Sequence, residues 1–113
     1  MTADGQDRLP STYVAFAARF PGLAESHAAA NQSVIDGGPL DERQCELIKI
    51  GICLGAGLES ALKSHVRRAL RHGASVEEVE QAVALGMTTS GWARTVAAWR
   101  WVHDQIERDA AEG

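Results

Sequence analysis

The run ELIKIGICLG, residues 46–55, constrains the fold of this chain more than any other stretch. On a helix its apolar side chains cover nearly every side, which is typical of a helix that is buried all round. A start signal precedes it, because Asp41 can cap a helix N-terminus and Gln44 lies three residues later. We therefore predict a helix from about residue 41 that forms the centre of the domain.

The other periodic segments are also helical, and none shows the alternation of a convincing strand. Glycine and proline separate them, most strongly at Gly37-Gly38-Pro39. The sequence thus predicts an all-α fold, a single-domain bundle of about six helices over 1–113. Its core is expected at 40–103 and a frayed tail at 108–113. The predicted helices cover residues 11–20, 22–35, 41–54, 58–72, 75–87 and 92–107.

Composition excludes several classes of protein. The chain has 113 residues, a formal charge of -4 and a pI near 5.5, which argues against nucleic-acid binding by bulk charge. No apolar run approaches the ~20 residues that span a bilayer, and the first ten residues lack the pattern of a signal peptide. We expect no membrane partner and a cytoplasmic location. A helical chain of this size is often stabilised by a partner subunit.

Two helices carry informative faces. In the fourth predicted helix, leucines such as Leu58 and Leu62 point inward and basic residues such as Arg67 and Arg68 point outward. In the last, one stripe holds Trp92, Val96, Trp99, His103 and Ile106. Trp99 and Trp101 point to nearly opposite sides of that helix, so one core contact cannot use both. Because tryptophan is enriched at interfaces, we expect at least one of them at a subunit contact.

Two polar residues interrupt apolar stripes. Glu46 shares a row with Ile50 and Cys53, and His65 occupies a similar position on the next helix. Short-linked consecutive helices pack antiparallel, which brings the two residues to similar heights. A carboxylate and an imidazole that meet there would tune one another's pKa, as acid–base catalysis requires. The alternatives are a Glu46 that reaches solvent at the helix start and a His65 bonded to a backbone carbonyl.

The remaining chemical signals are weak. Cys45 and Cys53 lie eight residues apart on one predicted helix, about 12 Å, which is too far for a disulfide between them. The sequence has no C-x-x-C and no cysteine and histidine spacing typical of zinc. The Gly-x-Gly at 55–57 does not follow a strand, so it does not indicate a nucleotide site. We therefore predict structural thiols, no metal and no cofactor.

One long segment resembles a known family. The run LDERQCELIKIGICLGAGLESALKSHVRRALRHGASVEEVEQAVALGMTTSGW is similar to the carboxymuconolactone decarboxylase and alkylhydroperoxidase D-like family. The most telling parts are its Leu-Asp…Glu-Leu-Ile opening, the helix that carries His65, and the Gly-Ala-Ser and Glu-Glu that follow. The resemblance implies an all-α homo-oligomer, commonly a trimer or hexamer, with the site between helices and near subunit contacts.

Within that family, the peroxidase-like branch carries C-x-x-C-x-x-x-H. Aligned with LESALKSH, His65 matches the histidine, whereas Leu58 and Ala61 occupy the cysteine positions. Glu46 matches the glutamate that serves as a proton relay. The resemblance therefore implies an acid–base site without the redox pair, as in the decarboxylase branch. The segment TTSGWARTVAAWRW lacks the Gly-x-Pro turn usual there, so the substrate stays open.

The leading hypothesis is a decarboxylase-like lyase that acts on a small, anionic organic substrate. Its catalytic residues would be Glu46 and His65, with His65 as general acid or base and Glu46 orienting it. The first alternative is a catalytically silent, ligand-binding or structural oligomer. The second is peroxidase-like thiol activity at Cys53, disfavoured because a thiol cycle needs a second, resolving cysteine within reach.

Overall fold

The computed structural model describes residues 11–112 and contains six α-helices and one short 3-10 helix. No strand occurs in this part of the chain, so the prediction of an all-α fold of about six helices is confirmed. No helix between residues 11 and 112 combines the length and apolarity needed to cross a membrane. The helices are α1 (Ser11–Arg19), α2 (Pro21–Asp36), α3 (Glu42–Ala56), α4 (Glu59–Arg71), α5 (Val76–Ala84), η2 (Leu85–Thr88) and α6 (Trp92–Glu112).

The chain divides into two compact units, Met1–Pro39 and Leu40–Gly113. The boundary falls at Gly37-Gly38-Pro39, the strongest break that the sequence shows. In its described part the first unit holds α1 and α2, and neither helix has a buried residue. Its internal packing includes the rings of Phe16 and Phe20, whose centroids lie 5.5 Å apart. The first unit therefore has no hydrophobic core of its own.

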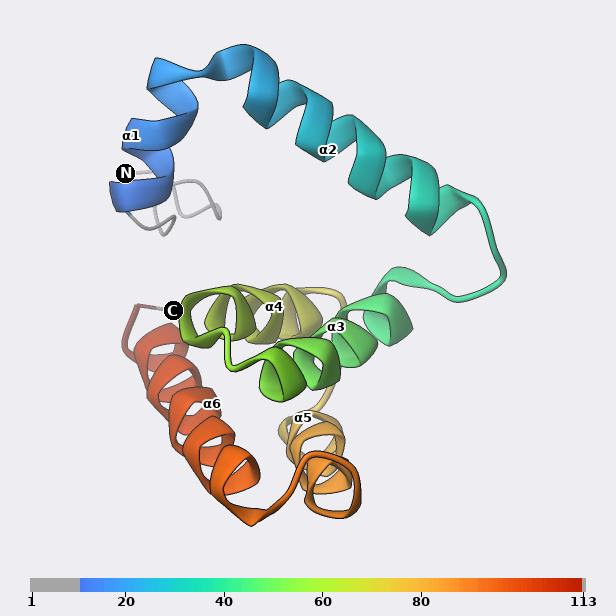
Figure 1. Cartoon of the computed structure of the whole chain (residues 1–113), viewed down its shortest axis with the longest axis vertical. Helices are drawn as coiled ribbons and strands as arrows, with labels where there is room; N and C mark the ends of the chain where they lie inside the picture. Colours follow the sequence, from blue (N-terminus) through green and yellow to red (C-terminus); the bar gives the residue numbers. More distant parts are fainter. Residues whose placement is uncertain (1–10, 113) are drawn as a thin grey trace. The chain divides into compact units, whose positions relative to one another are not determined.

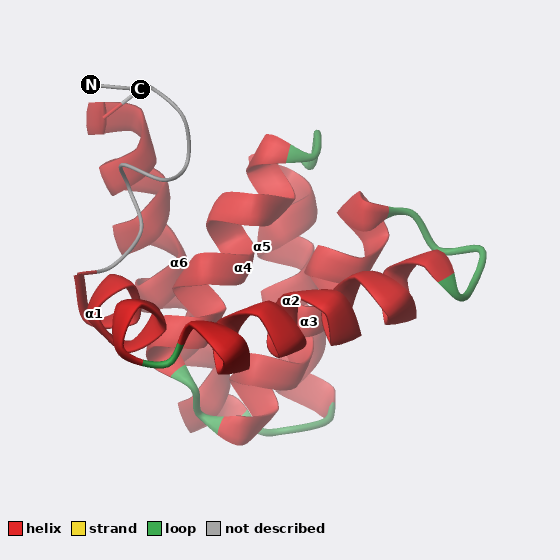
Figure 2. Cartoon of the chain, turned by 90° about the horizontal axis from the view of Figure 1, so that it is seen from above, coloured by secondary structure: helices red, strands yellow, loops and turns green. Residues whose placement is uncertain are grey.

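The second unit is a bundle built around α3 and α4. These two helices form its most extensive contact, α5 packs on α3, and α6 packs on both α4 and α5 (Figures 1 and 2). The short η2 joins α5 to α6 and also contacts α3. The largest side chains buried completely at the centre are Ile50, Leu54, Leu62, Val66, Val79, Val83 and Val102.

The capping box expected at Asp41 and Gln44 is present, and a second one starts α5. The Asp41 side chain accepts a hydrogen bond from the backbone N–H of Gln44, whose side chain in turn accepts one from the Asp41 N–H. Ser75 and Glu78 form the same reciprocal pair at the start of α5. These boxes satisfy orphan donors of the first helical turn, so they define where α3 and α5 begin.

Within the second unit, the prediction that α3 is buried on all sides is wrong. Its inward face, which includes Ile50 and Leu54, is buried, but Ile48 and Ile52 on the opposite side are about half or more exposed. The second unit has helices to cover one face of α3 and no element over the other. An apolar pattern indicates that a side chain favours burial, but it does not identify the element that buries it.

The structure differs from three further predictions made from the sequence. Arg67 is buried rather than solvated, because α6 covers its face of α4, whereas Leu58 at the start of α4 is exposed. The stripe with Trp92 and Trp99 lies largely outside, since α6 packs through smaller residues (Thr95, Ala98, Val102) that allow a closer approach. The helix also continues to Glu112, five residues beyond its expected end.

Candidate acid–base site

A tight turn places Glu46 and His65 opposite one another. α3 ends at Gly57, which adopts the left-handed conformation with φ 72°, and α4 starts two residues later. The Arg94 side chain of α6 lies against this turn and donates hydrogen bonds to the carbonyls of Gly55 and Leu54, at 2.8 and 3.4 Å. The chain thus reverses direction within a few residues, and the first turn of α3 lies beside the second half of α4.

The two side chains form a short, buried hydrogen bond. His65 Nδ1 lies 2.6 Å from Glu46 Oε1. The Glu46 side chain is 4% exposed and that of His65 is 16% exposed, so the imidazole is partly accessible and the carboxylate hardly at all. Glu46 does not extend to solvent, and Nδ1 of His65 is held by a carboxylate. The structure therefore brings the two predicted site residues together, while their catalytic role stays a prediction.

Opposing influences set the pKa of Glu46. Burial is the largest, and it acts to raise the pKa because it removes the charged form from water. The hydrogen bond to His65 and the positive charges of His65, Lys49 and Arg68 act against burial and lower the pKa below its ordinary value of 4.5. Glu46 is therefore ionised at neutral pH although it is buried, and it holds a proton on the facing nitrogen of His65.

Two other histidine–glutamate pairs show what distinguishes this one. His72 Nε2 lies 3.1 Å from Glu42 Oε2, and both side chains are more than a third exposed. His103 Nε2 lies 3.0 Å from a carboxylate oxygen of Glu80, at about 30% exposure, without the geometry of a hydrogen bond. Exposed pairs contribute little and are screened by water. Glu46–His65 is the most deeply buried of the three.

One family model matches most of the chain. The model of the carboxymuconolactone decarboxylase family matches residues 21–104, nearly three quarters of the chain. The chain belongs to the carboxymuconolactone decarboxylase family. No curated protein and no solved structure matches it. Membership in this family also confirms the resemblance that the sequence showed.

In this member of the family, Cys53 lies two turns after Glu46 on the same buried face of α3. Burial raises the pKa of the Cys53 thiol, and the negative charge of Glu46 raises it further. A thiol with a raised pKa holds little thiolate at neutral pH, which is the reactive form. The positions aligned with the family's cysteine pair hold Leu58, which is exposed, and Ala61, which is half-buried.

Sequence patterns do not single out Lys49 or Arg68 as site residues. Both are half-buried and close enough to Glu46 for their charges to lower its pKa. A usable signal exists for Lys49, because it is the one basic residue inside the apolar run 46–55. Arg68 has no such signal, since a run of arginines on a helix is usually a solvated face.

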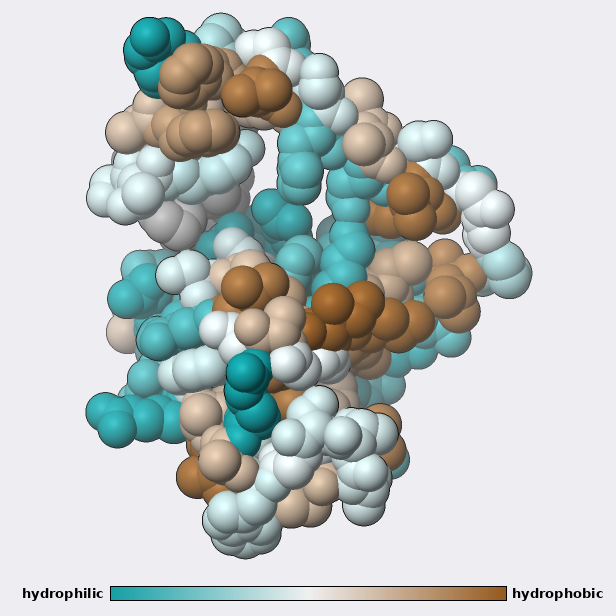
Figure 3. All heavy atoms as spheres, in the orientation of Figure 1, coloured by the Kyte–Doolittle hydropathy of each residue, from teal (hydrophilic) through white to brown (hydrophobic). Residues whose placement is uncertain are grey.

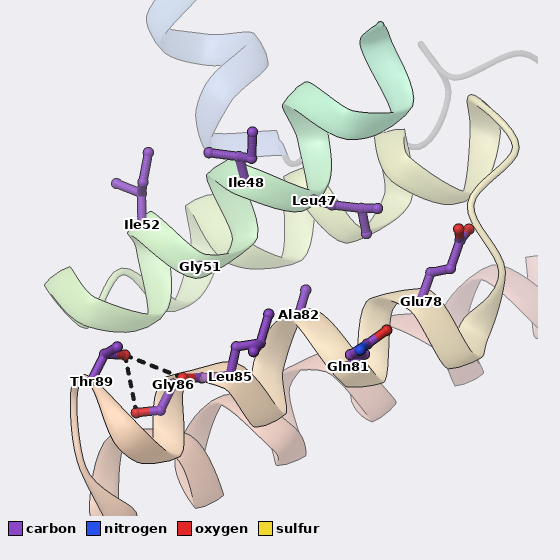
Figure 4. A pocket seen from close by; sticks show the side chains of 10 residues that line it. All are labelled: Leu47, Ile48, Gly51, Ile52, Glu78, Gln81, Ala82, Leu85, Gly86 and Thr89. Atoms are coloured by element: carbon purple, nitrogen blue, oxygen red, sulfur yellow. Dashed lines mark hydrogen bonds between the residues drawn. The ribbon is translucent and has the colours of Figure 1, made fainter. Parts of the chain in front are cut away.

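An apolar groove lies on another side of α3, against α5 and η2 (Figure 4). Its volume is about 510 Å³, and neither Glu46 nor His65 lines it. In Figure 4, Leu47 points from α3 toward α5, while Ile48 and Ile52 point away from α5. Among residues 11–112, no three histidine, cysteine or acidic side chains gather closely enough to hold a metal ion.

Proposed function

We propose that this family member catalyses acid–base chemistry at Glu46 and His65, by decarboxylation or a related proton transfer on a small organic anion. One observation carries the proposal. A buried, ionised carboxylate holds Nδ1 of a histidine at 2.6 Å, and that imidazole is the more accessible member of the pair. A carboxylate on one ring nitrogen fixes the tautomer and orientation of the ring, so the other nitrogen can exchange a proton with a substrate.

In a decarboxylation, His65 would act as the general acid. The bond between the substrate's carboxylate carbon and its neighbour breaks, the electron pair passes into the substrate's own conjugated system, and carbon dioxide leaves. The neighbouring carbon then takes the proton from Nε2 of His65, which recovers one from water. Glu46 stabilises the protonated ring before transfer and keeps Nδ1 protonated afterwards.

Charge near the site supports an anionic substrate. Lys49 and Arg68 lie near enough to lower the pKa of Glu46, and each is half-buried. These nearby cations favour a carboxylate over a neutral or cationic molecule, although the whole chain is acidic.

Substrate screening with matched variants tests the proposal. Small carboxylated lactones and related unsaturated acids are incubated with the protein, and carbon dioxide release is measured. His65→Gln should lower turnover about 10²–10⁴-fold, the usual contribution of a general acid or base. His72→Gln is the matched control, because it removes the exposed pair with Glu42 and should leave turnover unchanged.

The outcomes separate the proposal from its alternatives. Glu46→Gln should also lower turnover, because the ring then loses the anion that keeps it oriented and charged. A substrate that is turned over equally well by the native protein and His65→Gln would refute the assignment. Peroxide turnover that Cys53→Ser abolishes would instead establish thiol chemistry, which the raised pKa of Cys53 disfavours.

A further inference from the structure

A polar seam lies between α3 and α4 and consists of Glu42, Glu46, His65, Arg68 and His72. Along α4 and its C-cap, His65, Arg68 and His72 are spaced by three and four residues, so they share one face. His65 Nδ1 lies 2.6 Å from Glu46 Oε1. One turn earlier on α3, Glu42 Oε2 lies 3.1 Å from His72 Nε2. Arg68 therefore lies between two histidine–glutamate pairs.

Arg68 has no carboxylate partner of its own in this seam. Each of the two glutamates is held by a histidine, and no acidic side chain between residues 11 and 112 forms an ion pair with Arg68. Its positive charge helps to lower the pKa of Glu46, so the guanidinium lies near the acid–base pair without bonding to it. A guanidinium carries five donors, and a half-buried one favours an acceptor that replaces its lost water.

Lys49 is the other cation near Glu46, and it differs from Arg68 in position and shape. Each of the two cations follows its member of the acid–base pair by three residues, so on antiparallel helices they lie on opposite sides of that pair. An ammonium group is a point charge, whereas a guanidinium is a planar fork that matches both oxygens of a carboxylate. Arg68 can therefore recognise a carboxylate by shape as well as by charge.

The outer face of α3 has a different character. Within the second unit it carries Ile48 and Ile52, and hydrophobic side chains gather over α3 in the space-filling view (Figure 3). Apolar side chains have no donor for an anion. A carboxylate is therefore better accommodated at the polar seam than on this face.

The helix spacing connects Arg68 to the reacting group. Side chains three residues apart on a helix have Cβ atoms about 5–6 Å apart, so a carboxylate on Arg68 holds the rest of a small molecule beside His65. We propose that Arg68 binds a carboxylate of the substrate and orients the substrate toward Nε2 of His65. This assignment rests on the proposed acid–base function and adds the residue that selects carboxylates. Proton transfer stays with His65.

NMR titration with 4-fluorobenzoate as the probe tests carboxylate binding without turnover. The fluorine line gives the dissociation constant in every variant, and the ring resonance of His65, assigned by its loss in His65→Gln, should shift on binding. The amide 4-fluorobenzamide has the same shape and no charge, so it should bind much more weakly. Arg68→Gln should weaken 4-fluorobenzoate binding roughly ten- to a hundredfold, the usual effect of losing a hydrogen bond to a charged group.

Two further variants separate the fork from the charge. Arg68→Lys keeps the charge, so the pKa of Glu46 should stay low, but it loses the fork and should bind the probe with intermediate affinity. Arg71→Gln is the matched control, because Arg71 is an exposed arginine three residues farther along α4 and is not among the charges that lower the pKa of Glu46. Wild-type affinity in Arg68→Gln, an equal loss in Arg71→Gln, or equal binding of the acid and the amide would each overturn the assignment.

Failure of this assignment can be told apart from failure of the proposed function. If 4-fluorobenzoate binds through Arg68 but no substrate is turned over, the carboxylate site stands and the acid–base function fails. If a substrate needs His65 for turnover while Arg68→Gln leaves its KM unchanged, the acid–base function stands and the role of Arg68 is wrong.

Discussion

Glu46 is the least exposed ionisable residue between residues 11 and 112. It is 3% exposed, yet its pKa is lowered, because the hydrogen bond and nearby positive charges outweigh burial. The sequence shows a glutamate on the apolar face of one helix and a histidine on the apolar face of the next. Which atoms meet, and at what distance, depends on the crossing of α3 and α4, which periodicity does not specify.

The lowered pKa of Glu46 predicts how stability changes with pH. Between its folded pKa and the unfolded value near 4.5, the unfolded chain binds the proton more tightly, so folding is favoured as pH rises. The stabilisation is complete above the unfolded pKa and is lost as pH falls through the folded pKa. Urea unfolding between pH 6 and 3 should show this loss in the wild type and not in Glu46→Gln. Parallel curves for both proteins would contradict it.

Loss of His65 alone should cost more than loss of the whole pair. His65→Leu leaves a buried carboxylate without its partner, a defect worth about 3–5 kcal/mol in other proteins. The double variant with Glu46→Leu removes both polar groups and should recover much of the free energy of unfolding at pH 7. Denaturant titration of the four proteins measures the coupling. Additive single effects would mean that the two side chains do not interact.

Cys53 should be an unreactive thiol. Burial and the charge of Glu46 raise its pKa, so little thiolate forms at neutral pH. In the native protein a thiol reagent should modify the half-buried Cys45 first, and Cys53 only as the chain unfolds. Mass spectrometry of the labelled peptides reads this order. Rapid labelling of Cys53 in the folded protein would contradict it.

The helices themselves were largely predictable. Glycine, proline and the two capping boxes mark their ends, and these signals act over a few residues, so they can be read locally. Which face of α6 turns to the core was not predictable. Both its tryptophan stripe and its Thr95–Ala98–Val102 face are compatible with a core. Close packing on α4 selects the smaller residues, and that choice depends on a neighbour distant in sequence.

The turn between α3 and α4 positions the acid–base pair, and it depends on Gly57. A side chain there would adopt a left-handed conformation at a cost of about 1–2 kcal/mol, and its Cβ would lie 2.6 Å from Arg94 Nη1. Gly57→Ala should therefore lower the free energy of unfolding by at least that amount and displace Arg94 from the α3 carbonyls. Gly73→Ala, where φ is also positive but no atom lies within 4 Å, controls for the backbone cost alone. Equal losses for the two would show that Arg94 contributes nothing.

At the scale of the whole chain, the sequence predicts more burial for α3 than the second unit provides, for one physical reason. Hydrophobic periodicity indicates that Ile48 and Ile52 favour burial, but it does not identify the element that covers them. The same holds for α1 and α2, neither of which has a buried residue. The number of helices was predictable, because each has its own periodicity and end signals; the faces that they bury were not.

Carbon-13 NMR titration of the Glu46 carboxylate, in the wild type and in His65→Gln, tests the coupling of the two residues most directly. The wild type should give a Glu46 pKa below 4.5, held there by His65 and the nearby cations against burial. In His65→Gln the imidazolium charge is gone while burial persists, so the pKa should rise. A Glu46 pKa that is unchanged by the substitution would show that the two side chains do not form a coupled acid–base pair.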